Sequence, residues 1–346
     1  MNSLKYPGAT EANQILDQLQ KKNNILIISH PNPDGDSIGS SLALSRLLLK
    51  MGKNSNVVVP NGIPSYLLWL PGASEVIVYE SHAHKAEKII QEAEIVFFID
   101  FNSINRLNNI GKYFEQGNKT FILIDHHLQP ADIFDVVFHT TQVSSTSELI
   151  YDFIVKAGLK EWMDKEIATC LYTGIMTDTG SFSYSCNHPQ TYHVTAELIS
   201  LGINVSQIHN LVYDTFSEDR MRLLGHLLLN CMVVNHDLHT AYLYLSLTDQ
   251  KRFNFQPGDS EGFVNYALSI KGIRFAAFFT EKENLIRISF RSKGNFSVNN
   301  FARIHFDGGG HLNASGANSY RPLKDTLELF ESLLPAYADE LCKEDY

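Results

Sequence analysis

The sequence predicts an α/β protein with an N-terminal, mostly parallel open sheet flanked by helices, a helical connector, and a smaller C-terminal α+β domain. Strand-length apolar runs alternate with helical patterns in the first half, as is typical of parallel strands buried on both faces. After about residue 190 this alternation stops. The 346 residues also exceed the roughly 250–300 at which single cores stop growing. We therefore expect domains at 1–190 and 217–346, joined by a connector at 191–216.

The first domain is expected to contain six strands and at least two helices. Apolar periodicity predicts a helix over Ser37–Lys50, and Gly52 follows at a position where a left-handed residue commonly ends a helix. A second helix is expected to begin near Ser145, because Ser145 and Glu148 have the spacing of a capping box. The expected strands are Ile25–Ser29, Asn56–Pro60, Glu75–Tyr79, Ile95–Ile99, Phe121–Ile124 and Val136–Phe138.

The second half has a different pattern. Two amphipathic stretches, Thr191–Leu201 and Val205–Tyr213, predict the helices of the connector. The polar residues 281–284 separate two apolar runs and indicate a hairpin loop. The expected elements of the last domain are strands over Thr240–Leu247, Arg274–Thr280 and Leu285–Arg291, and one final helix over Lys324–Leu341.

Composition restricts the partners of this chain. The net charge is −10 and the pI is near 5.8, whereas proteins that grip long nucleic acid usually present a basic face. We therefore expect no long duplex nucleic acid as a partner, but a short anion that is held locally. No apolar run reaches the roughly 18 residues that cross a bilayer, and Met1–Pro7 lacks the apolar core of a signal peptide. The four cysteines include no C-x-x-C pair, so neither a zinc knuckle nor a disulfide framework is indicated. A cytoplasmic location without a membrane partner is expected.

Acidic and histidine side chains follow the predicted strands at the points where those strands end. In open α/β sheets, ligands bind beyond the carboxyl ends of the strands. A single aspartate there is commonly a helix N-cap, but several carboxylates gathered at one sheet edge repel one another and require compensating positive charge. Carboxylate and imidazole donors together suit manganese, with magnesium, iron or cobalt as alternatives. The candidate residues are His30, Asp34, Asp36, Asp100, Asp125, His126, His127 and Asp178.

The ordered set of motifs resembles the DHH/DHHA1 phosphoesterase superfamily, and most of all its branch of nano-RNases and pAp phosphatases. The resemblance covers nearly the whole chain, and the metal positions show no departure from the family pattern. It implies that His30 and Asp34 hold one metal ion and that Asp100 bridges to a second. The motifs are His30-x-x-x-Asp34-x-Asp36, Asp100, Asp125-His126-His127, Asp178 and Gly308-Gly309-Gly310-His311. The implied ligands of the second ion are Asp36, His126 and Asp178.

The resemblance also implies a reaction. A hydroxide that bridges the two ions would attack phosphorus in line, while the ions neutralise charge on the phosphoryl oxygens. Asp125 would orient a ligand imidazole. His127 would face the substrate phosphate or the leaving oxygen, so Asp125 and His127 are the expected catalytic residues beside the metal ligands.

The second domain is expected to clamp the substrate. Glycines at Gly308, Gly309 and Gly310 allow a backbone to approach an anion closely, although glycines alone also make turns. Followed by His311, they match the nucleotide-binding signature of the family that the chain resembles. Arg291 is a candidate for a bidentate grip on a phosphate, with a solvated strand end as its alternative. Arg106, six residues after Asp100, is a weaker candidate of the same kind.

The expected function is hydrolysis of 5′-phosphorylated oligonucleotides of a few residues, linear dinucleotides such as pApA, and 3′-phosphoadenosine 5′-phosphate. One alternative is an inorganic pyrophosphatase or exopolyphosphatase with the same metal domain. Against it, such enzymes are expected to coat a naked phosphate with Lys and Arg clusters rather than with a glycine-rich segment. The other alternative is a metal-dependent nucleotide sensor without turnover, against which the complete ligand set argues. A homodimer is compatible with the sequence.

Overall fold

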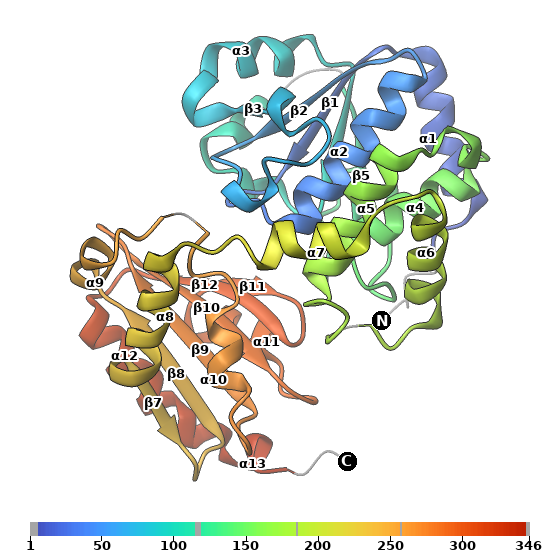
Figure 1. The fold of residues 1–346 in the computed structure, drawn as a ribbon. Helices are drawn as coiled ribbons and strands as arrows, with labels where there is room; N and C mark the ends of the chain where they lie inside the picture. The colour runs from blue at the N-terminus through green and yellow to red at the C-terminus, as the bar shows by residue number, and fades with distance from the viewer. Residues whose placement is uncertain (1–5, 115–118, 185, 257, 344–346) are drawn as a thin grey trace. The chain divides into compact units, whose positions relative to one another are not determined.

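The computed structural model describes residues 6–114, 119–184, 186–256 and 258–343. The chain forms two compact units, Met1–Thr215 and Phe216–Tyr346, each of which contains its own six-stranded sheet (Figure 1). Residues 1–5, which belong to the stretch considered for a signal peptide, lie outside the described part. Within the described part, no helix combines the length and the apolar character that crossing a membrane requires.

The first unit is built around a parallel sheet with the strand order β3-β2-β1-β4-β5-β6. All six predicted strands are present, so the predicted parallel sheet is confirmed. The third strand is shorter than expected, because Tyr79 begins a helix instead of ending the strand. The strands are β1 (Asn24–Ser29), β2 (Asn54–Val59), β3 (Ile77–Val78), β4 (Ile95–Ile99), β5 (Thr120–Asp125) and β6 (Val136–His139).

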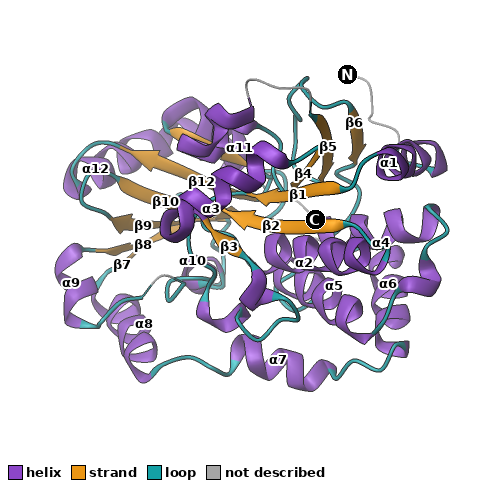
Figure 2. Ribbon diagram, turned by 90° about the horizontal axis from the view of Figure 1, so that it is seen from above, coloured by secondary structure: helices purple, strands orange, loops and turns teal. Residues whose placement is uncertain are grey.

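Helices cover both faces of this sheet (Figure 2). Successive side chains of a strand point to opposite faces, so Ile25 and Ile27 of β1 pack with α1, α2, α4 and α5, while Leu26 and Ile28 pack with α3 and the 3-10 segment η3. The helical elements are α1 (Ala9–Lys21), α2 (Gly35–Lys50), η1 (Ser65–Leu67), η2 (Ala73–Glu75), α3 (Tyr79–Glu92), η3 (Ile104–Phe114), α4 (Thr146–Lys156), η4 (Lys160–Trp162), α5 (Lys165–Asp178), α6 (Pro189–Ser200) and α7 (Val205–Tyr213).

The two helices expected to connect the domains, α6 and α7, bury apolar side chains in the core of the first unit. Val194 and Leu198 of α6 belong to the same apolar cluster as the buried residues of α2, α4 and α5. Ile208 and Val212 of α7 belong to it as well. Their apolar stripes therefore serve the packing of this unit. The chain enters the second unit immediately after α7, at Phe216.

The predicted end of α2 at Gly52 and the predicted start of α4 at Ser145 are both present, but the hydrogen bonds of Glu148 at the start of α4 differ from the prediction. Gly52 adopts a left-handed conformation with φ of 77° after α2. Ser145 caps α4, and its hydroxyl accepts a hydrogen bond from the Glu148 N–H at 3.1 Å. The reciprocal half of the predicted capping box is absent, since the Glu148 carboxylate instead accepts hydrogen bonds from Ser144 and Thr191.

The second unit contains a mixed sheet with the order β11-β12-β10-β9-β8-β7, in which β8 and β9 are parallel and the other neighbours are antiparallel. Phe290 and Phe330 belong to a largely aromatic core on one face, and Phe263 packs with α8 in a mainly aliphatic core on the other face. The strands are β7 (Met232–Asn235), β8 (Thr240–Leu245), β9 (Phe275–Glu281), β10 (Ile286–Ser292), β11 (Asp307–Gly310) and β12 (Ala314–Ser319). The helices are α8 (Glu218–Asn230), α9 (Leu247–Arg252), α10 (Phe263–Leu268), α11 (Val298–His305), α12 (Leu323–Leu333), η5 (Leu334–Tyr337) and α13 (Ala338–Leu341).

The prediction of one continuous helix at the end of the chain is wrong. The structure replaces one helix over Lys324–Leu341 by α12, the 3-10 turn η5 and α13. Pro335 lies in η5, and proline lacks the N–H that a continuous helix needs at that point. The predicted strand over Thr240–Leu247 is also too long, because Ser246 caps α9 through a hydrogen bond from the Asp249 N–H.

Candidate metal centre

The candidate residues of the first unit lie where the direction of the strand order reverses. From β1 the chain passes outward through β2 and β3, and then returns to the other side of β1 to form β4, β5 and β6. Crevices for ligands occur at such switch points, beyond the carboxyl ends of the strands. His30 follows β1, Asp100 follows β4, and Asp125 ends β5. The strand order thus brings together residues that are up to about 95 positions apart in the sequence.

The first donor group consists of His30, Asp34 and Asp100, whose ligand atoms all lie within 4.8 Å of one another. His30 Nε2 is 3.5 Å from Asp100 Oδ2 and 3.9 Å from Asp34 Oδ2. The other oxygen of Asp34 accepts a hydrogen bond of 3.0 Å from the Ser37 N–H at the start of α2. Asp34 is thus the helix N-cap that its position suggested and also a member of the donor group.

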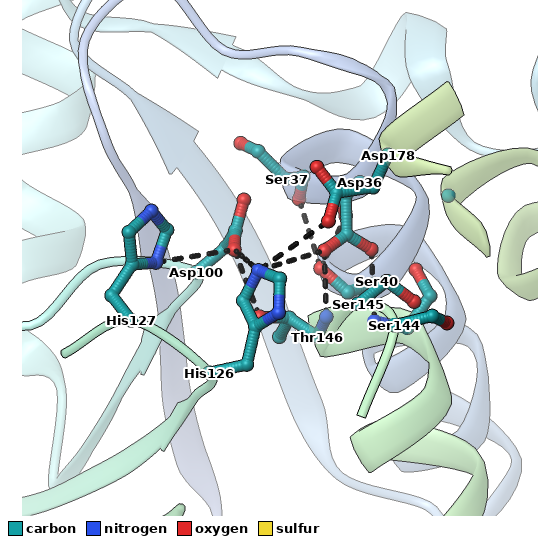
Figure 3. Close-up of polar contacts among 12 residues, drawn as sticks. Asp36, Ser37, Ser40, Asp100, His126, His127, Ser144, Ser145, Thr146 and Asp178 are labelled. Atoms are coloured by element: carbon teal, nitrogen blue, oxygen red, sulfur yellow. Dashed lines mark hydrogen bonds and ion pairs between the residues drawn. The ribbon is translucent and has the colours of Figure 1, made fainter. Parts of the chain in front are cut away.

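The second donor group consists of Asp36, His126 and Asp178, again within 4.8 Å (Figure 3). His126 Nε2 lies 3.5 Å from Asp178 Oδ2 and 4.0 Å from Asp36 Oδ2. A backbone hydrogen bond to Val143 holds the His126 ring. Asp178 is the last residue of α5, Asp36 lies in the first turn of α2, and His126 directly follows β5.

Asp100 faces both donor groups. Its Oδ2 lies toward His30, as given above, and its Oδ1 is 3.6 Å from His126 Nε2. Its backbone is left-handed, with φ of 64°, which costs an L-residue about 1–2 kcal/mol. The Thr146 hydroxyl donates a hydrogen bond of 2.8 Å to Oδ1. The surrounding structure therefore holds one carboxylate between two imidazoles.

The N-terminus of α4 supports the centre, which sequence reasoning missed. Asp36 Oδ2 accepts the Thr146 N–H at 2.6 Å (Figure 3), and Oδ1 accepts the Ser147 N–H at 2.8 Å. The positive end of a helix dipole favours a carboxylate at this position. The spacing of Ser145 and Glu148 indicated only where a helix starts, and the run of hydroxyl residues at 144–147 was the available signal.

A glycine allows α5 to approach this carboxylate. A Cβ at Gly174 would lie 1.9 Å from Ser147 Oγ and 2.8 Å from Asp36 Oδ1. Such distances are far below van der Waals contact, so a larger residue would displace the α4 N-terminus or the carboxylate. Gly174 therefore fixes the separation between α5 and the donor Asp36.

Asp125 and His127 form a second polar layer beside the centre. His127 Nδ1 lies 2.7 Å from Asp125 Oδ1 and 3.7 Å from Asp100 Oδ1. Asp125 thus orients His127, whereas the sequence suggested a ligand imidazole for this role. Asp125 Oδ2 is buried and has no hydrogen-bond partner among the described residues. The charge of Arg106 is among the causes that lower the pKa of His127, so this arginine lies close enough to act on the same ring.

Burial determines the charge state of the donors. It raises the pKa of Asp36 to about 7, although hydrogen bonds from Ser147 oppose it. Burial, followed by the charges of Asp36 and Asp34, raises the pKa of Asp100 well above its usual range. Burial lowers the pKa of His126 and of His127. Ionised carboxylates and neutral imidazoles are the forms that bind divalent metals, and a cation would supply the positive charge that these buried carboxylates lack. The donor set therefore fits divalent metal ions.

These pKa shifts predict that the metal-free chain loses stability as the pH rises from about 6.5 to about 8. Asp36 and Asp100 bind protons more tightly when folded, so their contribution is present below their unfolded pKa of about 4 and is lost as the pH rises through the folded pKa. His126 and His127 have the opposite sign, but their contribution is complete above their unfolded pKa of about 6.5.

Thermal unfolding of the chelator-treated chain checks this expectation. The Tm should fall by several degrees over that pH interval, and Mn²⁺ should raise the Tm more at the higher pH. Asp36→Asn removes one of the two titrating carboxyls, so it should flatten the fall. A metal-free Tm that rises over the interval would contradict the assignment of these charges.

Apart from Arg106, which lies in the first unit, the candidate clamp residues belong to the second unit. Gly308, Gly309 and Gly310 form the edge strand β11 rather than an open loop. A Cβ at Gly308 would lie 2.4 Å from Ala317 Cβ on β12, so close strand pairing needs a glycine there. The Gly310 N–H donates to Asn299 Oδ1 at 2.9 Å, which occupies one of the amides expected to face an anion.

His311 and Arg291 come together at one end of this sheet. His311 opens the turn between β11 and β12, and its N–H donates to the Ala314 carbonyl at 2.7 Å. Arg291 lies opposite Ala314 in the register of β10 and β12. The guanidinium of Arg291 donates to the Phe290 carbonyl at 3.0 Å. The sequence placed Arg291 at the end of a strand, and the structure places it one residue before that end.

The doubly wound sheet and its carboxylate–imidazole centre define the class as an α/β protein with a site suited to divalent metals. Residues 24–175 match the N-terminal domain of the DHH family, and residues 239–343 match the DHHA1 domain. A Thermus thermophilus protein named bifunctional oligoribonuclease and PAP phosphatase NrnA is 30% identical over 93% of this chain and 91% of its own length. The chain therefore belongs to the DHH family, and it is a hydrolase.

Two further comparisons agree with this assignment. A Bacillus subtilis protein with the same name is 26% identical over 89% of this chain and 93% of its own length. A crystal structure of an exopolyphosphatase-related protein from Bacteroides fragilis is 40% identical, with a TM-score of 0.91 over 96% of this chain and 98% of that chain. The similarity extends over both units, which confirms the family resemblance and the fold expected from the sequence.

Proposed function

We propose that this chain is a two-metal phosphoesterase that cleaves short 5′-phosphorylated oligonucleotides and linear dinucleotides such as pApA, and that also removes phosphate from 3′-phosphoadenosine 5′-phosphate. The observation that carries this proposal is the position of Asp100. Its two carboxylate oxygens face different imidazoles, 3.5 Å from His30 Nε2 and 3.6 Å from His126 Nε2. A single carboxylate between two donor groups is the arrangement that two neighbouring metal ions require.

The ligands would be divided between the two ions. His30 and Asp34 would hold the first ion, and Asp100 would serve both. Mn²⁺ suits this mixture of carboxylate and imidazole donors, with Mg²⁺, Fe²⁺ or Co²⁺ as alternatives. When bound, such ions make water a stronger nucleophile and neutralise charge on the phosphoryl oxygens. The second ion would be held by Asp36, His126 and Asp178.

His127 is the proposed contact to the reacting phosphate or to its leaving oxygen. The Asp125 carboxylate accepts a hydrogen bond from Nδ1 at 2.7 Å, which fixes the tautomer and turns Nε2 to the opposite side of the ring. The nearby Arg106 guanidinium would bind a phosphate oxygen and, by its charge, keep the imidazole neutral. Because the neutral ring carries its proton on Nδ1, Nε2 would first take up a proton from water and then donate it to the leaving oxygen.

The second unit is proposed to bind the nucleotide. His311 in the β11–β12 turn and Arg291 on β10 lie at the same end of the sheet. An imidazole and a guanidinium suit a terminal phosphate. The names of the Thermus thermophilus and Bacillus subtilis relatives support oligonucleotide and nucleotide substrates. An exopolyphosphatase is the second candidate, because the Bacteroides fragilis relative is described as exopolyphosphatase-related.

Short substrates should be strongly preferred. The net charge of −10 disfavours long polyanions, because sequence-independent strand binding needs a positively charged groove. Rates on 5′-labelled RNA should therefore fall steeply between about 3 and about 24 nucleotides. The measurement is a time course at equal concentrations of 5′ ends with Mn²⁺. Equal rates on the two lengths would contradict the proposed substrate class.

A further inference from the structure

A group of three metal-ligand side chains in the second unit has no part in the proposed phosphoesterase reaction. His226, Cys231 and Asp249 each offer one ligand atom, and these three atoms lie within 4.8 Å of one another. His226 Nε2 is 3.2 Å from Asp249 Oδ1 and 3.7 Å from Cys231 Sγ. All three residues lie in the unit Phe216–Tyr346, and no ligand proposed for the phosphoesterase centre is a cysteine.

Local structure brings these three donors together. His226 lies in the last turns of α8, and Cys231 is the residue that caps its C-terminal end. The Tyr244 N–H of β8 donates to the Cys231 carbonyl at 3.2 Å, which aligns the end of α8 with the strand that leads to α9. Asp249 then follows in the first turn of α9. The group therefore joins the entry helix of the second unit to the helix after β8.

Outer hydrogen bonds hold two of the donors in place. The Ser246 hydroxyl donates to Asp249 Oδ2 at 2.6 Å, which leaves Oδ1 directed toward His226. The Asn230 Nδ2 group lies 3.2 Å from His226 Nδ1 and donates to the His226 carbonyl at 3.2 Å; with a metal on Nε2, this amide would turn its oxygen toward the protonated Nδ1. Metal-ligating imidazoles and carboxylates commonly have such partners, which orient them.

A plain hydrogen-bonded cluster accounts for only part of this geometry. If His226 Nε2 carries a proton, it donates to Asp249 Oδ1, and the 3.2 Å distance is explained. The Cys231 sulfur contacts the Tyr244 hydroxyl and also faces the same nitrogen atom, so one N–H would have to serve two acceptors. A cation that is shared by the nitrogen, sulfur and oxygen accounts for the convergence of all three. The side chains of His226 and Asp249 are 16% and 17% exposed, which leaves a path for an ion from solvent.

We propose that His226 Nε2, Cys231 Sγ and Asp249 Oδ1 bind a divalent zinc-class cation, separate from the phosphoesterase centre. Nitrogen, thiolate and carboxylate donors are the ligands of Zn²⁺, and three protein ligands leave the fourth tetrahedral position to water. Binding releases the thiol proton to solvent, and the imidazole binds in its neutral form through Nε2, with the ring proton on Nδ1. The bound ion ties the end of α8 to α9 and thereby stabilises the second unit.

Cobalt titration of the full chain tests this site, because a thiolate–cobalt bond gives a near-ultraviolet charge-transfer band that carboxylate and imidazole ligands do not give. After treatment with a chelator, the band should grow with added Co²⁺ and saturate at one thiolate-bound ion per chain. Zn²⁺ should abolish the band by displacement. Cys231→Ser should remove it, while the matched variant Cys342→Ser, at an exposed cysteine, should retain it.

Two further variants keep the test decisive if Cys231→Ser does not fold. His226→Gln and Asp249→Asn change partly exposed ligands, and each should weaken Co²⁺ binding, read from the band, by about tenfold or more. The site is refuted if the wild-type chain shows no thiolate band, if the band survives Cys231→Ser, or if both ligand variants bind with unchanged affinity. Phosphoesterase activity with Mn²⁺ is a separate readout, so failure of one proposal does not decide the other.

Discussion

Asp100→Asn should reduce phosphoesterase activity by about 10³-fold or more, because it removes the charge that both metal ions would share. Asparagine keeps the size of the side chain and an oxygen for the Thr146 hydroxyl, which donates to Asp100 at 2.8 Å. Asparagine also removes a buried carboxyl whose pKa is raised by burial and by its neighbours. The metal-free variant should therefore be at least as stable as the wild-type chain.

Metal content, rate and Tm of this variant should be measured together. The wild-type chain should contain two ions at the proposed centre, and the variant should lose at least one of them. Asp132→Asn, at an exposed position, makes the same change of charge away from the centre and should have a normal rate. A near-normal rate for Asp100→Asn, or only one ion at the wild-type centre, would exclude the proposed two-metal arrangement.

His311→Ala should strongly reduce nucleotide hydrolysis while the metal content of the first unit stays unchanged. His311 belongs to the β11–β12 turn of the second unit, and its proposed partner is a part of the substrate remote from the cleaved bond. Binding energy from such parts can be used to position the reacting group, so the loss should affect kcat as well as KM. An activated ester such as bis-p-nitrophenyl phosphate makes no such contact, and its slow hydrolysis should change little.

Variants of the proposed metal ligands in the first unit should differ from His311→Ala in their effect on the two substrates. His126→Ala and Asp36→Ala each remove a proposed ligand and should abolish both reactions. Asp36 also accepts two backbone N–H groups of α4, so circular dichroism should accompany that variant. If His311→Ala leaves nucleotide turnover unchanged, or removes metal from the chain, the proposed clamp is wrong, and the β11–β12 turn serves packing alone.

The central strands β1, β4 and β5 could be predicted from the sequence because each is a nearly continuous apolar run that ends at a charged or polar residue. Ile95–Ile99 is a strand with the predicted bounds, and the acid that follows it is brought beside His30. The spacing of the donors could not show the role of α4. Thr146 and Ser147 contribute backbone N–H groups to Asp36, and backbone groups leave no residue-specific signal.

The second unit was harder to predict for physical reasons. Its edge strand β11 is made largely of glycine, which lacks the apolar alternation that indicates a strand. Pro335, which lies inside the predicted last helix, was itself the available signal for the interruption of that helix. The group at His226, Cys231 and Asp249 was invisible for a different reason. Its members come from two helices on either side of a β-hairpin, so no C-x-x-C spacing marks it, and the absence of that motif excludes only the common zinc frameworks.

Incubation of the chain with pApA, 3′-phosphoadenosine 5′-phosphate and pyrophosphate in separate reactions, with Mn²⁺, tests the proposed function most directly. We predict that each pApA takes up one water and yields two molecules of AMP, and that 3′-phosphoadenosine 5′-phosphate yields AMP and inorganic phosphate. Pyrophosphate should be cleaved far more slowly than either nucleotide. Cleavage of pyrophosphate alone, or binding of pApA without release of AMP, would contradict the proposed function.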